Sequence, residues 1–467
     1  MKKPKASLLI PVENQVRELD AKLLLACVAA KRGLTSIIGP KRLVESRATS
    51  YPRSIYLSKS LLHGHRKFLV LARKFGHEIA AWDEDALVHL PPETSFSRRL
   101  SPVTLGCVSH LFAWGEDNAD LWRQYPQLPA GIPIHVTGNP RGDLLRSEIR
   151  GFYQATVEEL QRVHGDFILI NTNFNHVNAF TPNRNLFQPG AKEGQTPIFG
   201  RAARGMTQAY AEGLRDHKQA NFEHFQKMIP ALAKAFPNHN IVVRPHQVED
   251  PEVYHKIAGC CKRVRVINKG YVVPWLKASR LLIHNGCTTS VEAFAMGVPV
   301  VSYRATVNPE YDDGFYRLPN GLSRHCFNFK ELEETLGQIL DRRPMADTGI
   351  DRQALFARYL AAQDGALACE RMVDVLAKAA LELDNAPKPP LRDRLESWYK
   401  ITKRRLRRSS ILDHTGAHAS LEYQRHKHPD VSIDDLRSRI KRFQQLLGHD
   451  AELKVDQVYP RVFRISS

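Results

Sequence analysis

Short runs of β-branched and aliphatic residues alternate with segments of helical period from residue 6 onward. This alternation is typical of parallel α/β sheets. The first predicted strand, 6–12, is followed by a helix that places Leu19, Leu23 and Cys27 on one apolar face. Five more strands are predicted at 36–38, 54–57, 78–82, 110–114 and 132–136. We therefore expect a doubly wound, Rossmann-like domain over residues 1–155.

A second series of the same kind is predicted over residues 156–386. Its strands are expected at 167–171, 241–244, 265–268, 281–284 and 298–303. A polar loop, 172–205, is long enough to have a functional role of its own, and a long helix follows over 205–236. The predicted architecture is two Rossmann-like, doubly wound domains facing a cleft. Ligands of such sheets bind at the carboxyl ends of the strands.

The Pro-Lys-Pro-Pro run at 387–390 marks a further boundary, and residues 387–467 are predicted to form a basic helical C-terminal extension. Residues 388–467 contain 18 Lys+Arg and 10 Asp+Glu, a net charge of +8. Within 391–408, one helical face carries Leu391, Leu395, Trp398, Thr402 and Leu406, surrounded by basic residues. Two roles stay open for this helix. It could lie on the inner membrane near a lipid-linked acceptor, or pack against the first domain with its charges in water.

The overall charge indicates a polyanionic partner. The chain has 467 residues, with 67 Lys+Arg against 49 Asp+Glu, so its net charge is +18. Nucleic acid, an acidic membrane and an anionic substrate all fit that charge, although no nucleic-acid motif is present and we expect no such partner. The seven cysteines have no C-x-x-C spacing, and no signal peptide or membrane-spanning run is evident. We expect a cytoplasmic protein without a metal or other cofactor.

Acidic residues recur just after the predicted strands of the first domain. Glu13 follows the first strand, Asp83, Glu84 and Asp85 follow Trp82, and Glu116 follows Trp114 and Gly115. Carboxylates that meet at one rim of a sheet are what acid–base or nucleophilic catalysis requires. The alternative is that these residues are solvated turn and capping residues, as Asp and Glu often are.

In the second domain, a small and hydroxyl-rich turn, 284–290, joins a predicted strand to a predicted helix. The N–H groups at a helix N-terminus suit a phosphate. Upstream, Arg244 and His246 close another strand and are candidates to face the same phosphate. The alternative is ordinary helix capping by a Thr or Ser side chain of the turn.

Together these segments resemble the bacterial surface-carbohydrate biosynthesis proteins, a family similar to the retaining Kdo transferases, which are GT-B enzymes that use CMP-Kdo. The resemblance extends over roughly residues 6–385. It rests on the segments 9–25, 82–85, 112–115, 137–141, 244–246 and 284–293. It implies a GT-B-like glycosyltransferase that builds lipopolysaccharide, O-antigen or capsule from a CMP-activated donor onto a glycan or lipid-linked glycan acceptor.

The resemblance also implies residue roles. It makes the acidic motif with Asp83 and Glu84 catalytic, with Asp83 as nucleophile, and makes Glu13 and Glu18 supporting carboxylates. The nucleotide-sugar-binding residues that it implies are Arg244, His246, Asn285, Gly286, Thr288, Thr289 and Glu292. Arg244, His246 and the two threonines are expected to hold the phosphate, and Glu292 the ribose. No metal is implied, because His246 and backbone N–H groups neutralise the phosphate.

Two alternatives to Kdo transfer stay open. A CDP-glycerol-type polyol-phosphate transferase also uses a cytidylyl donor, a GT-B fold and a basic surface. A non-catalytic scaffold protein of polysaccharide assembly would keep the two-domain fold and turn over no nucleotide sugar.

Overall fold

A computed structural model describes residues 5–89, 91–188, 198–312, 316–343, 349, 351–411, 430–449 and 451–467. The chain divides into two compact units. Unit 1 contains residues 1–152 and 357–467, and unit 2 contains residues 153–356. The sequence placed 357–386 with the second domain and treated 387–467 as a separate extension. The structure assigns both to unit 1, because helix α17 (Ala368–Asn385) packs against helix α1 (Gln15–Lys31) and the C-terminal strand joins the unit 1 sheet.

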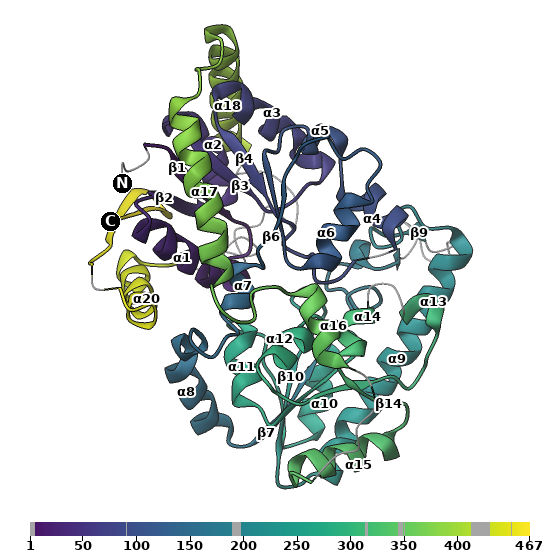
Figure 1. Ribbon diagram of the computed structural model, residues 1–467. Helices are drawn as coiled ribbons and strands as arrows, with labels where there is room; N and C mark the ends of the chain where they lie inside the picture. Colours follow the sequence, from purple (N-terminus) through teal and green to yellow (C-terminus); the bar gives the residue numbers. More distant parts are fainter. Residues whose placement is uncertain are drawn as a thin grey trace. The chain divides into compact units, whose positions relative to one another are not determined.

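The unit 1 sheet has the strand order β15-β16-β2-β1-β3-β4-β5-β6 (Figure 1). Strands β1 to β6 are parallel. The strands are β1 (Ser7–Val12), β2 (Ser36–Pro40), β3 (Ser54–Ser58), β4 (Glu78–Ala81), β5 (His110–Ala113), β6 (Ile134–Val136), β15 (Lys454–Tyr459) and β16 (Val462–Ser466). From β1 the chain first adds β2 on one side and then returns to add β3 on the other. The order of the strands therefore reverses between β1 and β3, which is the topological switch point where such sheets bind ligands.

Helices cover this sheet. Besides α1 and α17, they are α2 (Lys41–Ser46), α3 (Arg66–Phe75), α4 (Pro92–Arg99), α5 (Pro102–Leu105), α6 (Glu116–Arg123), α7 (Pro140–Asp143), α18 (Leu391–Ile411) and α20 (Ile433–Leu446). Short 3₁₀ helices lie at Ala48–Ser50, His63–His65 and Arg150–Tyr153. Helix α1 begins where the Asn14 side chain accepts the N–H of Arg17, and α3 ends at Gly76, whose φ is 111°.

The C-terminal segment contributes strands as well as helices, which the sequence-based prediction of a helical extension omitted. Strand β16 pairs antiparallel with β2, with Phe463 opposite Ile38, and β15 pairs with β16. Without this hairpin, β2 would be an open edge of the sheet. Helix α20 begins where the N–H of Asp435 donates to Ser432 Oγ at 3.0 Å. The C-terminal segment thus completes the sheet of unit 1.

Unit 2 contains a sheet of six parallel strands in the order β11-β10-β7-β12-β13-β14. They are β7 (Phe167–Asn171), β10 (Asn240–Arg244), β11 (Val264–Val266), β12 (Leu281–His284), β13 (Val300–Tyr303) and β14 (Arg324–Cys326). Numbered within the unit, this is the Rossmann order 3-2-1-4-5-6, so the switch point lies between β7 and β12. A separate two-stranded ribbon, β8 (Phe187–Gln188) and β9 (Ile198–Phe199), lies in the predicted functional loop, whose residues 189–197 are outside the described part.

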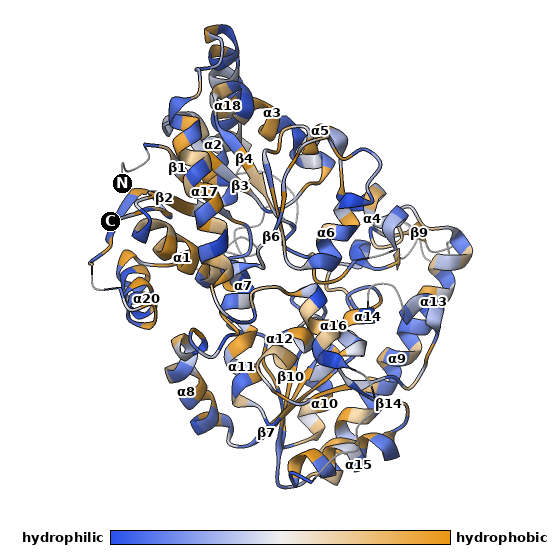
Figure 2. Ribbon diagram, viewed as in Figure 1, coloured by the Kyte–Doolittle hydropathy of each residue, from blue (hydrophilic) through white to orange (hydrophobic). Residues whose placement is uncertain are grey.

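The helices of unit 2 are α8 (Gln154–His164), α9 (Gln208–Ala235), α10 (Glu252–Cys260), α11 (Val272–Ala278), α12 (Thr289–Ala295), α13 (Pro309–Asp312), α14 (Arg317–Gly321) and α15 (Phe329–Leu340). Helix α16 (Arg352–Tyr359) runs across the boundary between the units, and a short 3₁₀ helix lies at Pro182–Arg184. Apolar residues line the strands (Figure 2), and the core of this unit packs α9 against them through Phe225, Ile229 and Leu232. The prediction of two Rossmann-like sheets is confirmed.

Candidate functional site

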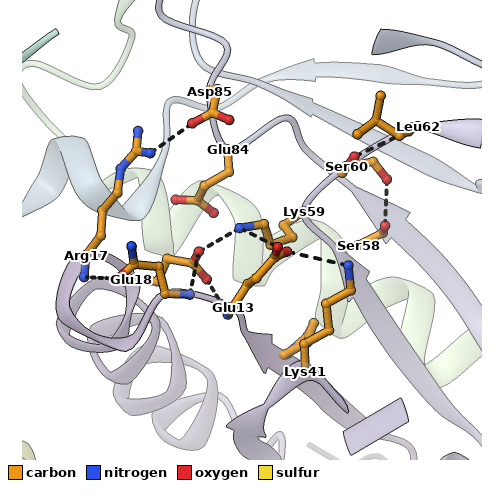
Figure 3. Close-up of polar contacts among 12 residues, drawn as sticks. Glu13, Arg17, Glu18, Lys41, Ser58, Lys59, Ser60, Leu62, Glu84 and Asp85 are labelled. Carbon is orange, nitrogen blue, oxygen red and sulfur yellow. Dashed lines mark hydrogen bonds and ion pairs between the residues drawn. The ribbon is translucent and has the colours of Figure 1, made fainter. Parts of the chain in front are cut away.

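At the switch point of unit 1, Glu13 follows β1 and Lys59 follows β3 (Figure 3). The Glu13 carboxylate lies 3.5 Å from the Nζ atoms of both Lys59 and Lys41. Its side chain is 42% exposed, whereas each lysine side chain is 14% exposed. This carboxylate reaches solvent between two largely buried ammonium groups. This is the arrangement that a nucleophile or general base requires.

Glu18, at the start of α1, is buried next to Glu13 and Lys59. Its Oε2 accepts from Lys22 Nζ at 2.7 Å and from the N–H of Glu13 at 2.9 Å. Its Oε1 accepts from Lys59 Nζ at 2.6 Å and from the N–H of Asn14 at 3.1 Å. Burial raises the pKa of Glu18, but the ammonium groups of Lys22 and Lys59 lower it by a larger amount. The pKa of Glu18 is therefore below its ordinary value. Glu18 therefore fixes the start of α1 and the position of Lys59.

The acidic residues that follow β4, Asp83, Glu84 and Asp85, have different surroundings. Both carboxylate oxygens of Asp83 accept from the Arg99 guanidinium, with Nε at 3.0 Å, and the backbone oxygen of Asp83 accepts from Trp114 Nε1 at 2.7 Å. Glu84 is buried and accepts from Trp82 Nε1 at 2.9 Å. Because β4 ends at Ala81, the motif is a turn and its residues do not alternate as they would on a strand.

The structure thus brings Glu13, Glu18 and Glu84 around Lys59, with Asp85 paired to Arg17 at 2.9 Å nearby (Figure 3). Burial lowers the pKa of Lys59, but Glu18, Glu84 and Glu13 raise it, and the net shift is upward. The predicted nucleophile, Asp83, is held separately by Arg99.

The sequence did not single out Lys41 or Lys59. Each residue directly follows a strand, Lys41 after β2 and Lys59 after β3. The rule that selected the carboxylates at strand ends would also have selected these two cations. Lys41 Nζ donates to His65 Nε2 at 2.6 Å, and burial lowers the pKa of Lys41 despite the carboxylates of Glu45 and Glu13.

In unit 2, the predicted nucleotide-binding turn lies at the switch point between β7 and β12. Asn285 Oδ1 accepts the N–H of Asn173 at 2.8 Å, and Thr289 Oγ1 accepts from Asn171 Nδ2 at 2.9 Å. These bonds tie the ends of the two strands together. Thr288 is half-buried at the N-cap of α12, and Glu292 is buried in its first turn.

The N–H groups of this turn are arranged differently from the prediction. His284 Nδ1 accepts the N–H groups of Gly286 and Cys287, at 2.9 and 3.2 Å, while His284 Nε2 lies 2.7 Å from Ser323 Oγ. Burial lowers the pKa of His284 to about 3, so the ring is neutral. Two N–H groups of the predicted turn are therefore hydrogen-bonded to the imidazole.

Arg244 has a structural role in place of the expected phosphate contact. Its guanidinium donates to the carbonyl oxygens of Ile267, Lys269 and Gly270 at 3.3, 2.9 and 3.0 Å, and lies 4.7 Å from the ring centroid of Trp275. This side chain therefore anchors the loop after β11. His246 is exposed and its N–H donates to Glu249 Oε1 at 3.1 Å.

A polar pocket opens beside the turn, at the carboxyl ends of β7, β12 and β13, and the sequence did not predict it. Its polar lining includes His217, Lys218, Asn285, Arg304, Asp312 and Tyr316. The signal was present in α9, where the apolar stripe Ala211, Leu214, Phe222, Phe225 and Ile229 continues through Lys218. A lysine in the buried stripe of an amphipathic helix is uncommon and indicates a specific partner.

Neither a metal cluster nor a membrane-spanning helix is present in the part of the chain that the structure describes. No group of three or more His, Cys, Asp or Glu side chains there could hold a metal ion. None of the helices described is long and apolar enough to cross a bilayer. The four C-terminal histidines His414, His418, His426 and His428, which could also bind a metal, lie outside the described residues.

No protein-family model and no curated protein matches the chain. Among solved structures, the wall teichoic acid polymerase TagF, determined with CDPG, aligns with a TM-score of 0.50 and 11% identity over 81% of this chain and 89% of TagF. The chain has a GT-B-like fold. S. aureus MnaA with UDP has a TM-score of 0.48 and 14% identity, covering 82% of this chain and 100% of MnaA. UDP-GlcNAc 2-epimerase from Neisseria meningitidis has a TM-score of 0.45 and 14% identity, covering 80% of this chain and 100% of the epimerase.

Proposed function

We propose that this GT-B-like chain is a glycosyltransferase of bacterial surface polysaccharide biosynthesis that uses a nucleotide-activated sugar. The observation that carries the proposal is Glu13, a half-exposed carboxylate between Lys41 and Lys59 at the switch point of unit 1. The residues that surround it leave an exposed carboxylate at a place where α/β sheets bind ligands. We take Kdo or a related ulosonic acid, carried by CMP, as the first donor to test, following the sequence resemblance.

We assign the nucleophilic step to Glu13 in preference to Asp83. Both oxygens of Asp83 accept hydrogen bonds from Arg99, and the Asp83 side chain is 14% exposed. The Glu13 carboxylate lies farther from its cations, at 3.5 Å, and its side chain is 42% exposed. In a retaining transfer, a Glu13 oxygen bonds to the anomeric carbon as the sugar–phosphate C–O bond breaks, and CMP leaves with the electron pair. The acceptor hydroxyl then bonds to the same carbon, breaks the ester, loses its proton to a base and regenerates the carboxylate.

The deciding experiment is mass spectrometry of the intact protein after incubation with CMP-Kdo. We expect a covalent sugar adduct on the wild type and on Asp83→Asn, and none on Glu13→Gln. An adduct that is lost in Asp83→Asn and kept in Glu13→Gln would restore Asp83 as the nucleophile. Transfer that stops in Glu13→Gln without any wild-type adduct would make Glu13 the base of an inverting reaction. No turnover of any nucleotide sugar would favour a non-catalytic scaffold of polysaccharide assembly.

A second candidate is a polyol-phosphate transferase, which the similarity to TagF favours. TagF is a wall teichoic acid polymerase that was solved with CDPG. Thermal-shift screening with CMP, CDP-glycerol, UDP, GDP and ADP separates the donors, because a ligand that binds the native state raises Tm. Transfer from CDP-glycerol, and none from CMP-Kdo, would establish this second activity.

For the acceptor side, we propose that α18 contacts the cytoplasmic face of the inner membrane. The helix packs on α3, and Lys74 of α3 pairs with Glu396 at 2.8 Å. Ser397 and Ile401 of α18 are buried. The predicted apolar face points elsewhere, with exposures of 51% to 65% at Leu391, Leu395, Trp398 and Leu406. Basic residues such as Lys400, Lys403 and Arg404 flank it, which suits anionic lipid headgroups.

Sedimentation with vesicles tests this contact. We expect the protein to bind phosphatidylglycerol vesicles more tightly than phosphatidylcholine vesicles, and the double variant Trp398→Gln/Leu406→Gln to lose binding by about tenfold or more. The control is Val103→Gln in α5, which removes another exposed apolar side chain of unit 1. Equal loss in both variants, or no preference for anionic vesicles, would exclude α18 as the membrane contact.

A further inference from the structure

The polar pocket of unit 2 contains a buried ammonium group with a neutral partner. Lys218 of α9 is 6% exposed, and its Nζ donates to the hydroxyl of Tyr316. The same Nζ lies 4.4 Å from the centroid of the Tyr316 ring. The pocket carboxylate, Asp312, is bonded to Arg304 at 2.8 Å and to His217 at 3.0 Å. Within the described residues, no carboxylate forms an ion pair with Lys218.

The charges of the described residues that line the pocket do not cancel. The ammonium of Lys218 and the guanidinium of Arg304 contribute two positive charges, and Asp312 contributes one negative charge. Arg304 Nε is buried and has no hydrogen-bond partner among the residues described. A buried cation that lacks an anion is unfavourable unless a ligand supplies one. The excess of positive charge therefore calls for an anionic group.

The position of the pocket connects it to the predicted nucleotide turn. Asn285 belongs to both, and Gly286, with φ of 90°, lies against the Tyr316 ring. A Cβ at Gly286 would lie 2.3 Å from Tyr316 Cδ1. The glycine thus leaves room for the ring whose hydroxyl accepts from Lys218. The turn after β12 and the pocket form one continuous site beside the switch point of unit 2.

We propose that Lys218, with Arg304 and the Tyr316 hydroxyl, binds a phosphate group of a nucleotide in unit 2. Arg244, a predicted phosphate ligand, and the N–H groups of Gly286 and Cys287 are bonded to other groups of the protein. The inference rests on the proposed function for the choice of nucleotides as ligands. It does not depend on which sugar is transferred, or on which carboxylate of unit 1 reacts.

Isothermal titration calorimetry of the full chain with CMP and with cytidine tests the assignment. The same titrations are made with UMP, GMP, AMP, their nucleosides and inorganic phosphate. We expect the wild type to bind one monophosphate more tightly than its nucleoside. We expect Lys218→Met to lose about tenfold to a hundredfold in affinity for that monophosphate, because a hydrogen bond to a charged group is lost. Its affinity for the nucleoside should stay within about twofold of the wild type.

Three further variants separate binding from folding. Lys218→Arg keeps the charge and should retain most of the preference for the monophosphate, while Tyr316→Phe removes only the hydroxyl and should reduce it partly. Lys227→Met removes an exposed lysine of the same helix and should change nothing. A melting temperature measured without ligand identifies any variant that fails to fold.

Several results would overturn the proposal. One is a folded Lys218→Met that binds the monophosphate as tightly as the wild type does. Another is a Lys218→Met that loses affinity for the nucleoside and for the nucleotide equally. A third is a wild type that binds no monophosphate more tightly than its nucleoside and does not bind free phosphate. A preference that depends on Lys218, in a protein that transfers no sugar, would support the phosphate site and reject the proposed function. Free Kdo that binds in place of the monophosphate would assign the pocket to a sugar carboxylate, against the proposal.

Discussion

The two sheets of this chain follow the same topological rule and present different chemistry at their switch points. In unit 1, the Glu13 carboxylate reaches solvent between Lys41 and Lys59, and the buried Glu18 in the first turn of α1 pairs with Lys22 and Lys59. In unit 2, the described residues that line the pocket beside the switch point include two cations, Lys218 and Arg304, and one carboxylate, Asp312. On the proposals above, the sheet positions each site, while the side chains around the strand ends, including Lys218 of α9, decide its chemistry. An accessible carboxylate suits a reaction, and a buried cation suits the anchoring of an anion.

The largest effect that this contrast predicts is on the reaction. Replacing Glu13 with Gln removes the charge at the unit 1 switch point and should lower the rate of sugar transfer by about a thousandfold. The melting temperature should change little, because the side chain is 42% exposed.

Steady-state transfer assays with the donor identified by screening measure this effect. Glu116→Gln is the matched control, since Glu116 follows β5 in the same sheet and is 56% exposed. Equal activity in Glu13→Gln and Glu116→Gln would remove the catalytic role from the unit 1 switch point.

The second effect is on the stability of unit 1. Glu18→Gln leaves the ammonium of Lys22, which is 3% exposed, without its carboxylate, and should lower the free energy of unfolding by about 3–5 kcal/mol. Urea denaturation, with hydrogen exchange to locate the change in α1, measures it. The exposed pair of Arg32 and Asp374, 3.0 Å apart, provides the control, since Asp374→Asn should cost less than about 1 kcal/mol. A similar cost for both variants would mean that burial does not distinguish these pairs.

A smaller effect distinguishes the turn of unit 2. Gly286→Ala should destabilise the unit by about 1–3 kcal/mol and weaken nucleotide binding, because φ is positive and the new Cβ meets Tyr316. Gly297 also has a positive φ, 73°, but nothing lies near its missing Cβ. The difference in unfolding free energy between Gly286→Ala and Gly297→Ala therefore isolates the contact with Tyr316. If the two variants are equally stable, the ring does not require this glycine.

The smallest effect is the pH dependence of unit 2. The pKa of His284 is lowered to about 3 by burial, so its contribution to stability is full above its ordinary pKa of 6.5 and is lost as the pH falls toward the lower value. Because the unfolded chain takes up the proton first, stability should fall by about 0.8 kcal/mol between about pH 7.5 and pH 6 from this group. His284→Gln should flatten the profile in this range. An unchanged slope would mean that His284 is not held neutral.

The sequence predicted the six parallel strands of unit 1 and five of the six strands of unit 2 within about two residues at each end, because buried parallel strands are continuous apolar runs. It missed β14, which has only three residues, two of them Arg and His. It also placed Glu13 and the turn at 284–290 at strand ends, where the structure has them. It did not predict the C-terminal hairpin. Nor did it identify the role of Arg244, because the carbonyl oxygens that hold its guanidinium come from residues 267–270, more than 20 positions along the chain.

What the sequence determined by itself was the alternation of strands and helices, and with it the two parallel sheets and the polar residues at their carboxyl ends. Hydrophobic period and strand-end position are local properties, so they can be read along the chain. Only the tertiary structure decided that Glu13 reaches solvent while Glu18 is buried, that Asp83 pairs with Arg99, and that Lys218 meets Tyr316. Charge and burial depend on neighbours that are distant in sequence, and the fold alone brings them together.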